Sequence, residues 1–182
     1  MVKIYNGRPD ALDGRSENEI KVYDALDDLG IEYLSADHEA AFTMEACREV
    51  DEAFGVSLCK NLFLCNRQKT RYYLLLMPDD KPFKTKELSA QINSARLSFA
   101  GEEDMVRLLG VTPGSVTVMG LLNDTDHEVT LLVDHDLEDC EFFGCHPCVN
   151  TSSLKVRSDD IFGRFIAHTG HTATFVDLVG AD

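Results

Sequence analysis

The residues of this chain best suited to chemistry lie in one short stretch, Gly144-Cys145-His146-Pro147-Cys148-Val149-Asn150-Thr151. Gly144 permits a close approach between the backbone and a ligand, and Pro147 fixes the local backbone. His146 offers a donor, an acceptor or a proton near neutral pH. With Asn150, these residues predict a rigid ligand-binding loop. Considered alone, His146 is better interpreted as a structural loop histidine.

The cysteines of this stretch permit two other chemistries. Cys145 and Cys148 have the Cys-x-x-Cys spacing of thiol redox proteins, but no convincing helix follows them. Cys140 and a nearby histidine would add soft ligands for zinc, and the three cysteines also match an iron–sulfur spacing. No second Cys-x-x-Cys pair completes such a site. We therefore expect no metal and no cofactor, and we expect the six cysteines to be reduced thiols.

Two further positions could contact a ligand. In the Lys60-Asn61 pair, strand alternation buries one of the two side chains within an apolar strand, which is costly unless its polar group is satisfied. Such a side chain binds a ligand anion or carbonyl, or it lies at a strand edge with its head in solvent. The turn at Gly114-Ser115 presents backbone amides that could bind a carbonyl or phosphate, with a plain β-turn as the alternative.

Apolar periodicity and turn residues predict the elements that position these groups. Ser16 and Glu19 form a capping box for a helix that ends at Gly30, and Ser158 caps a last helix that ends at Gly170. Further helices are expected after Thr43 and over 85–92 and 102–109. Strands are expected over 31–34, 58–65, 71–77, 115–122, 128–134, 154–157 and 173–179, with 136–150 irregular.

Hairpins dominate the middle of this pattern, over 58–77 and 115–134. The prediction is an α+β fold with a central, mostly antiparallel sheet surrounded by helices, not a doubly wound parallel sheet. Residues 1–182 are long enough for one well-buried domain and short for two, so we expect a single domain.

Charge is unevenly distributed along the chain. The net charge of −15 by itself disfavours a nucleic-acid partner, because phosphate binding needs lysine and arginine. Residues 60–96, however, hold eight basic and three acidic side chains, a net charge of +5 that leaves −20 for the remainder. This basic segment predicts a local anion-binding face, with a solvated hairpin and helix as the alternative.

No apolar run approaches the roughly 18 residues that span a bilayer. The first residues, 1–7, lack the apolar core of a signal peptide. We therefore expect a cytoplasmic protein without membrane association. The oligomeric state is left open.

Four segments together resemble the prolyl-tRNA synthetase-associated editing-domain family, also called the YbaK-like family. They occur in the family's order and are Asp37-His38-Glu39-Ala40-Ala41-Phe42-Thr43, Cys59-Lys60-Asn61-Leu62-Phe63-Leu64, Val111-Thr112-Pro113-Gly114-Ser115-Val116-Thr117 and the Gly144–Thr151 stretch. The Lys60-Asn61 pair and the His146-Pro147 loop resemble the stand-alone, alanine-specific branch. The resemblance implies a mixed fold with a barrel-like, largely antiparallel sheet and deacylation of mischarged tRNA(Pro).

The resemblance also implies roles for individual residues. The expected catalytic residues are Lys60, Asn61 and His146, and the expected substrate-binding residues are Gly144, Pro147, Ser115, Asn150 and Thr43. The implied partners are the acceptor end of tRNA(Pro) and, as a candidate, prolyl-tRNA synthetase. Cys145 and Cys148 fall at positions that vary in the family, so the amino acid removed stays open between alanine and its neighbours in size.

The chemistry of such a reaction is compatible with this residue set. An aminoacyl ester is already activated, so positioning of a water and electrostatic stabilisation suffice without a nucleophilic triad or a metal. Lys60 would bind a phosphate or the carbonyl oxygen, while Asn61 and His146 hold the substrate amine, a ribose hydroxyl or the water. A small cavity would admit alanine and reject proline. The alternatives are a regulatory module that binds tRNA or an amino acid without catalysis and, with less support, a Cys-x-x-Cys redox protein.

Overall fold

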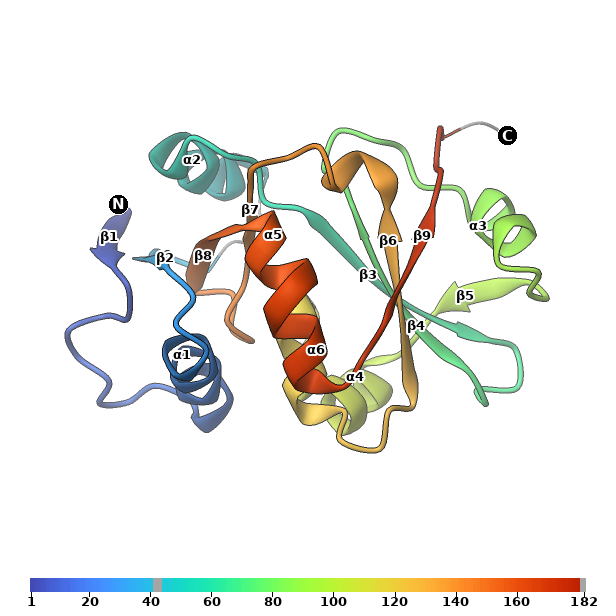
Figure 1. The fold of residues 1–182 in the computed structure, drawn as a ribbon, viewed down its shortest axis with the longest axis horizontal. Helices are drawn as coiled ribbons and strands as arrows, with labels where there is room; N and C mark the ends of the chain where they lie inside the picture. The colour runs from blue at the N-terminus through green and yellow to red at the C-terminus, as the bar shows by residue number, and fades with distance from the viewer. Residues whose placement is uncertain (41–43, 181–182) are drawn as a thin grey trace.

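The computed structural model describes residues 1–40 and 44–180, which form two sheets with helices packed around them (Figure 1). The first sheet is antiparallel throughout, in the order β1 (Lys3–Asn6), β2 (Tyr33–Asp37), β8 (Ser152–Arg157), β7 (Phe142–Cys145). The second has the order β5 (Leu97–Phe99), β3 (Lys60–Asn66), β4 (Tyr72–Met77), β6 (Val129–Asp134), β9 (Ala173–Val176). The α+β prediction is confirmed.

The helices begin and end largely where the sequence predicts. They are α1 (Glu17–Asp28), α2 (Met44–Phe54), α3 (Thr85–Gln91), α4 (Glu102–Leu109), the 3-10 helices η1 (Val118–Asn123) and η2 (His135–Leu137), and a continuous last helix made of α5 (Ser158–Asp160), the π-helical η3 (Ile161–Phe165) and α6 (Ile166–Thr169). The Ser16 hydroxyl accepts a hydrogen bond from the Glu19 amide at 3.2 Å, as the capping box predicts. Gly170 ends the last helix with a left-handed φ of 78°.

The predicted hairpin over 115–134 is wrong. Residues Val118–Asn123 form η1, which begins where the Thr117 hydroxyl accepts from the Met119 amide. A Cβ on Gly120 would lie 3.0 Å from the Leu109 carbonyl oxygen, so η1 packs closely against the end of α4. Strand β6 pairs in parallel with both β4 and β9. The apolar residues of 115–122 are buried against a helix, a pattern that periodicity alone does not separate from a strand.

The sheet is therefore less antiparallel and less closed than expected. Half of the strand pairs in the five-stranded sheet are parallel, and the two sheets do not close into a barrel. An isolated parallel bridge between Leu58 and Gly144 connects them. Smaller corrections concern 136–150, which contains β7, and Ser158, which begins the last helix instead of capping it. The Ser158 hydroxyl is buried without a hydrogen-bond partner among the described residues.

Strand β4 lies in the centre of the five-stranded sheet, and all of its residues are buried. Its alternate side chains face two apolar clusters on opposite faces of the sheet. The main cluster includes Phe63, Leu74 and Leu76 together with residues of α1, α4 and the first sheet, and the α3-side cluster includes Leu64, Leu75, Met77 and Leu88. The main cluster thus joins the two sheets into one core.

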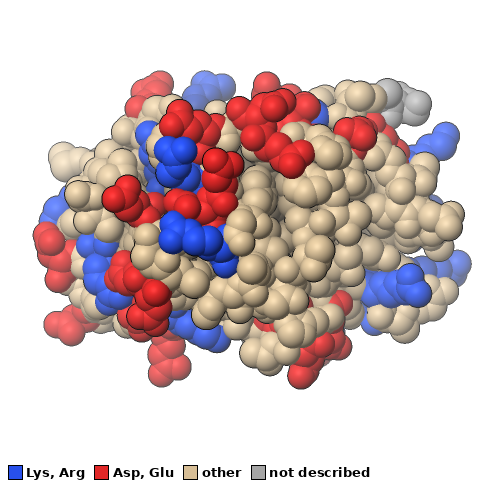
Figure 2. Space-filling view, in the orientation of Figure 1, with Lys and Arg blue, Asp and Glu red and all other residues tan. Residues whose placement is uncertain are grey.

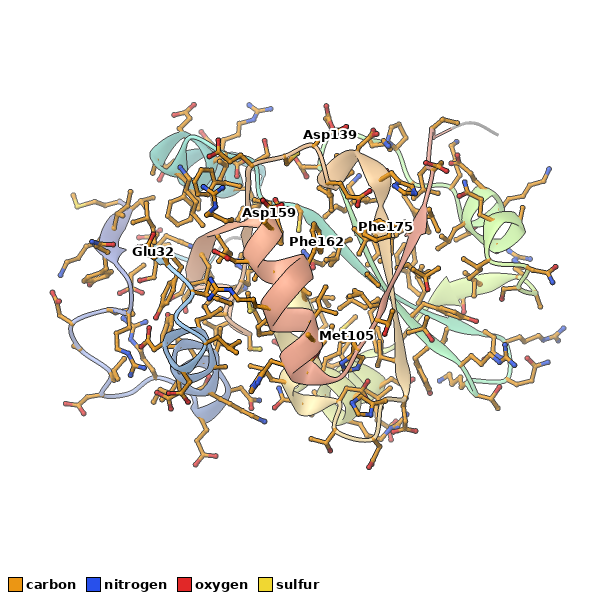
Figure 3. The ribbon with its side chains drawn as sticks, in the orientation of Figure 1. Glu32, Met105, Asp139, Asp159, Phe162 and Phe175 are labelled. Atoms are coloured by element: carbon orange, nitrogen blue, oxygen red, sulfur yellow. The ribbon has the colours of Figure 1, made fainter. Side chains whose placement is uncertain are left out.

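An aromatic row on the last helix strengthens this junction. Phe162 stacks on Phe143 of β7, with ring centroids 5.8 Å apart, and meets Phe175 of β9 edge-on at 6.3 Å. Phe162 projects from the helix toward Phe175 in Figure 3. The last helix therefore packs across one strand of each sheet.

A buried ionic network ties α1 to the first sheet. Arg15 lies 2.7 Å from the Glu19 carboxylate and 2.6 Å from that of Asp37. Glu19 is only 3% exposed and also accepts from Tyr23, while Ser152 donates to Asp37. Burial raises the pKa of Asp37, but the hydrogen bonds from Arg15 and Ser152 outweigh this effect and leave the pKa below its ordinary value.

Charge is unevenly distributed over the surface. In Figure 2 acidic and basic residues are intermixed over the left half, acidic residues gather along the upper edge, and basic residues predominate at the right-hand end, near the β3–β4 hairpin. None of the helices within residues 1–40 and 44–180 has the length and apolar character needed to traverse a lipid bilayer.

Replacing Arg15 by alanine leaves the Glu19 carboxylate buried without its cation. We expect Arg15→Ala to lower the free energy of unfolding by about 3–5 kcal/mol, measured by urea denaturation. Arg8→Ala is the matched control, because Arg8 also contacts two carboxylates, at 2.8 and 2.6 Å, but at the surface. The control should cost less than about 1 kcal/mol. Equal losses in the two variants would contradict the role of the buried network.

Candidate functional site

The Gly144–Thr151 loop is the common hydrogen-bond partner of the other three segments singled out in the sequence. The contacts are His38 N to Thr151 O at 3.0 Å, Cys59 N to Gly144 O at 2.9 Å, and Thr117 Oγ1 to His146 O at 2.6 Å. Segments that lie far apart in the sequence, such as those of His38 and Thr151, therefore meet at this loop. The loop lies between β7 and β8, where the two sheets approach each other.

Gly144 makes the approach of the two sheets possible. A Cβ built on it would lie 2.6 Å from Leu58 Cδ2 and 3.2 Å from Leu58 Cα. Its amide donates to Ser57 O at 3.3 Å, and its carbonyl accepts from Cys59 N. The close approach that the sequence predicts for this glycine is thus to the strand that leads into Lys60 and Asn61.

His146 has a fixed tautomer. Its Nδ1 lies 2.9 Å from the carbonyl oxygen of Ser152, which can only accept, so Nδ1 carries the proton. In the neutral ring the lone pair is then on Nε2. Burial lowers the pKa of His146 below 6.5, and the neighbouring His38 lowers it further. His146 therefore presents an unprotonated Nε2 at neutral pH.

His38, which the sequence analysis did not assign to the site, supports this arrangement. Its Nδ1 donates to Glu39 O at 2.7 Å, so its Nε2 accepts from the Ser153 hydroxyl at 2.8 Å. The Ser153 oxygen lies 3.3 Å from His146 Nδ1. The rings of the two histidines are 6.4 Å apart. His38 belongs to one of the four segments that carry the family resemblance, but its partner Ser153 is 115 residues away.

Asn61 lies on the face of β3 that turns toward the main cluster, as its pairing with Leu76 shows. Its amide nitrogen donates to Cys59 O at 2.9 Å and lies 3.3 Å from the Cys59 thiol. Its carbonyl oxygen Oδ1 is buried and has no hydrogen-bond partner among the described residues. Exchanging the amide oxygen and nitrogen would set two oxygens against each other at Cys59, so the observed orientation is the favourable one.

Lys60 faces the other side of β3. It pairs with Met77 of the α3-side cluster, and its ammonium donates to Lys81 O at 2.8 Å. Lys60 and Asn61 are therefore not presented to the same face of the strand. Asn61 and His146 each follow a few residues after the parallel bridge between Leu58 and Gly144. Lys60 instead lines a groove next to α3.

The remaining predicted residues have different surroundings. Ser115 is buried, and its hydroxyl donates to Thr112 O at 2.9 Å and accepts from Thr112 N at 3.1 Å, so it stabilises its own turn. Pro147 is buried next to His146, and Asn150 is half-buried in the same loop. Thr43 lies outside the described residues.

The cysteines do not form the arrangements considered as alternatives. All six are free thiols. Burial raises the pKa of Cys148 to about 12 and that of Cys145 well above its ordinary value, whereas a redox Cys-x-x-Cys pair needs a lowered pKa. Within residues 1–40 and 44–180, no group of three or more histidine, cysteine, aspartate or glutamate side chains is arranged to hold a metal ion.

Gly144→Ala should disturb this site through the backbone. The new methyl would meet Leu58 Cα as well as its side chain, so the 57–59 segment must move. We expect a loss of about 1–3 kcal/mol in the free energy of unfolding and faster hydrogen exchange of the Cys59 amide. Gly163→Ala, in the last helix with open space around the glycine, is the control and should be neutral or stabilising. An unchanged Cys59 amide in Gly144→Ala would refute the proposed constraint.

The comparisons with known proteins agree with this architecture. The prolyl-tRNA editing protein ProX of Acetoanaerobium sticklandii is 29% identical over 84% of this chain and 93% of its own. The prolyl-tRNA synthetase associated domain-containing protein 1 of Danio rerio is 33% identical over 82% of each chain. A solved structure described as a candidate trans-editing enzyme for prolyl tRNA synthetase superposes with a TM-score of 0.66 at 16% identity, over 90% of this chain and 98% of its own.

The structural likeness shows a shared fold, and the sequence matches show the family. The family model for the aminoacyl-tRNA editing domain matches residues 38–163, which begin at His38 and include the whole Gly144–Thr151 loop. This chain therefore belongs to the aminoacyl-tRNA editing domain family.

Proposed function

We propose that this protein is a trans-editing hydrolase that deacylates mischarged tRNA(Pro), with alanyl-tRNA(Pro) as its main substrate. Water attacks the ester carbonyl, the bond to the ribose oxygen breaks, and that oxygen takes up a proton, which releases the amino acid and the tRNA. Family membership supports the reaction class, and the names of the ProX and synthetase-associated relatives support the tRNA. The contacts of Asn61 and His146 support the assignment of roles.

The observation that carries the proposal is the unsatisfied carbonyl oxygen of Asn61. A buried acceptor without a donor costs about 1–3 kcal/mol, so a ligand that supplies a donor gains affinity there. The α-ammonium group of an aminoacyl ester and a ribose hydroxyl are both such donors. The Asn61 amide nitrogen, which donates to Cys59 O, holds the oxygen in this orientation.

His146 supplies the complementary group. Because Nδ1 donates to Ser152 O, Nε2 carries the lone pair and can accept a proton or a hydrogen bond from the attacking water or the substrate amine. The chain of contacts through Ser153 to His38 fixes the ring in this orientation. Neither role requires a metal or a covalent intermediate.

Lys60 acts from the other face of β3. Its contact with Lys81 O uses one of the three donors of an ammonium group, and its charge suits a phosphate near the scissile ester. Gly144 and Pro147 shape the loop, and Ser115 fixes the turn that leads to Thr117. Asn150 and Thr43 complete the proposed set of substrate-binding residues.

Residues 1–182 are proposed to act as one editing domain, since the main cluster contains residues from Val22 to Ile166. The proposed partner is the acceptor end of tRNA(Pro), with prolyl-tRNA synthetase as a candidate source of the mischarged tRNA. Discrimination would rest on size, because a cavity that accepts a methyl group excludes the proline ring.

The direct test is hydrolysis of alanyl-, cysteinyl-, seryl- and prolyl-tRNA(Pro). We expect release of alanine to exceed release of the others and prolyl-tRNA(Pro) to survive. Asn61→Ala should lower the rate about 10- to 100-fold, because it removes the acceptor. Asn66→Ala, at the other end of the same strand, should keep the activity. Binding of the tRNA without release of any amino acid would favour a regulatory module and overturn the proposal.

The state of His146 predicts the pH dependence. Its lowered pKa leaves Nε2 mostly unprotonated at neutral pH, so activity should hold at neutral pH and fall as pH drops through the lowered value, which lies below the ordinary 6.5. His146→Gln should reduce the rate and remove this acidic limb. His135→Gln is the control, because His135 is exposed and its Glu138 partner raises its pKa. A profile with its acidic limb above 6.5 would contradict the assignment.

A further inference from the structure

A groove of about 640 Å³ lies on the α3 side of the five-stranded sheet. Its lining combines three lysines with two phenylalanines over an aliphatic floor. They are Lys60, Lys84, Lys86, Phe83, Phe99 and Leu62, and Thr85 completes the lining. The groove is separated from Asn61 by strand β3 alone, because Lys60 and Asn61 are consecutive residues on opposite faces.

Phe99 is unusual among the apolar residues of this sheet. It belongs to the edge strand β5 and pairs with Leu64, which is fully buried, yet 60% of Phe99 is exposed. Leu97, two residues earlier on the same face, is buried. Sheet alternation thus places the Phe99 ring on an apolar face, but nothing in the described chain covers it fully. Exposed aromatic residues next to cations are the usual platform for unpaired nucleobases.

Phe83 fixes the orientation of this ring. The two ring centroids are 6.0 Å apart with an interplanar angle of 66°, an edge-to-face arrangement. The edge of one ring is used in this contact, and the exposed surface of Phe99 remains open. Phe83 itself packs against the α3-side cluster, so the pair is anchored in the core.

The charges around the groove favour an anionic ligand. The lining contains three lysines and no acidic residue. The nearby Glu87 accepts from the backbone amides of Val179 and Gly180, at 2.7 and 3.1 Å, and is thereby directed to the C-terminal segment. Lys81, which does not line the groove, is neutralised by Asp134 and Asp136. The net charge of −15 creates an electrostatic field that repels RNA, and this groove is a locally positive region within it.

We propose that this groove binds the single-stranded 3′ end of the tRNA, with a nucleobase stacked on Phe99 and backbone phosphates held by Lys86 and Lys84. This inference rests on the proposed function and extends it by naming the surface that holds the nucleotides next to the ester. The 3′ end would run along the groove to Lys60, which brings the terminal ribose to the start of β3, beside Asn61.

The test measures binding without catalysis. A fluorescent RNA hairpin that mimics the acceptor stem and ends in an unpaired CCA extension, without an amino acid, is titrated with the protein and followed by anisotropy. The same hairpin with a blunt end is the comparison. We expect the extension to strengthen binding roughly tenfold or more. Equal affinities for the two hairpins would overturn the proposal.

Variants at position 99 separate stacking from simple hydrophobicity. Phe99→Tyr keeps the ring and should bind within about twofold of the wild type, whereas Phe99→Leu should lose roughly tenfold and bind both hairpins alike. Val106→Leu is the control, because Val106 is exposed to a similar degree (53%) on α4, away from the groove. Full affinity in Phe99→Leu would refute the stacking role. A change in oligomeric state in that variant, seen by sedimentation, with unchanged RNA affinity would assign the groove to self-association instead.

The phosphate contacts are tested by salt dependence. Lys86→Ala should reduce the slope of log affinity against log salt concentration by about 0.7, the value for one phosphate on a single strand. Lys69→Ala is the matched control, since Lys69 belongs to the same basic segment but lies in the β3–β4 hairpin loop, outside the groove lining. An equal change in the two variants would show a diffuse charge effect and contradict the groove. The RNA in these experiments carries no aminoacyl ester, so they measure binding alone. The deacylation assay tests the proposed function independently, and one can fail without the other.

Discussion

The close contact between Gly144 and the Ser57–Cys59 segment is the constraint on which the rest of the candidate site depends. It connects two sheets that otherwise pack through side chains, and it tolerates no side chain at position 144. The two segments run in the same direction from this bridge. The segment after Leu58 continues into β3, and the segment after Gly144 continues into the His146 loop. Backbone hydrogen bonds at this bridge set the positions of the two segments, while side-chain contacts with Cys59 and Ser152 orient Asn61 and His146.

Strand β3 presents different polar groups on its two faces. On one face Asn61 meets a buried, uncharged environment, where a single unsatisfied oxygen is a significant energetic feature. On the other face Lys60 opens into a groove with other lysines and two aromatic rings. A substrate with an amino acid at one end and a polyanionic chain at the other requires these two kinds of surface next to each other.

Burial has opposite consequences for the histidine and the cysteines of the Gly144–Thr151 loop. It keeps His146 neutral, because the charged form of an imidazole is its protonated form, and it keeps Cys145 and Cys148 protonated, because the charged form of a thiol is the thiolate. The same environment therefore favours His146 as a proton acceptor and disfavours the cysteines as nucleophiles. This effect of burial favours a ligand-binding loop over a thiol redox pair among the interpretations that the sequence left open.

The sequence by itself determined the helices with strong caps, the β3–β4 hairpin, the α+β class and the family, because these depend on local periodicity, on turn residues and on short motifs. It also located the loop around His146 and the glycine at its start. It did not determine that residues 118–123 form a 3-10 helix or that β6 joins β4 and β9 in parallel, since a buried apolar run fits a helix or a strand equally well. Only the tertiary structure decided that Lys60 and Asn61 face opposite sides, that the Asn61 side-chain oxygen is left unsatisfied, and that His38 and Ser153 support His146. These facts depend on pairings between residues far apart in the chain, and no local pattern records them.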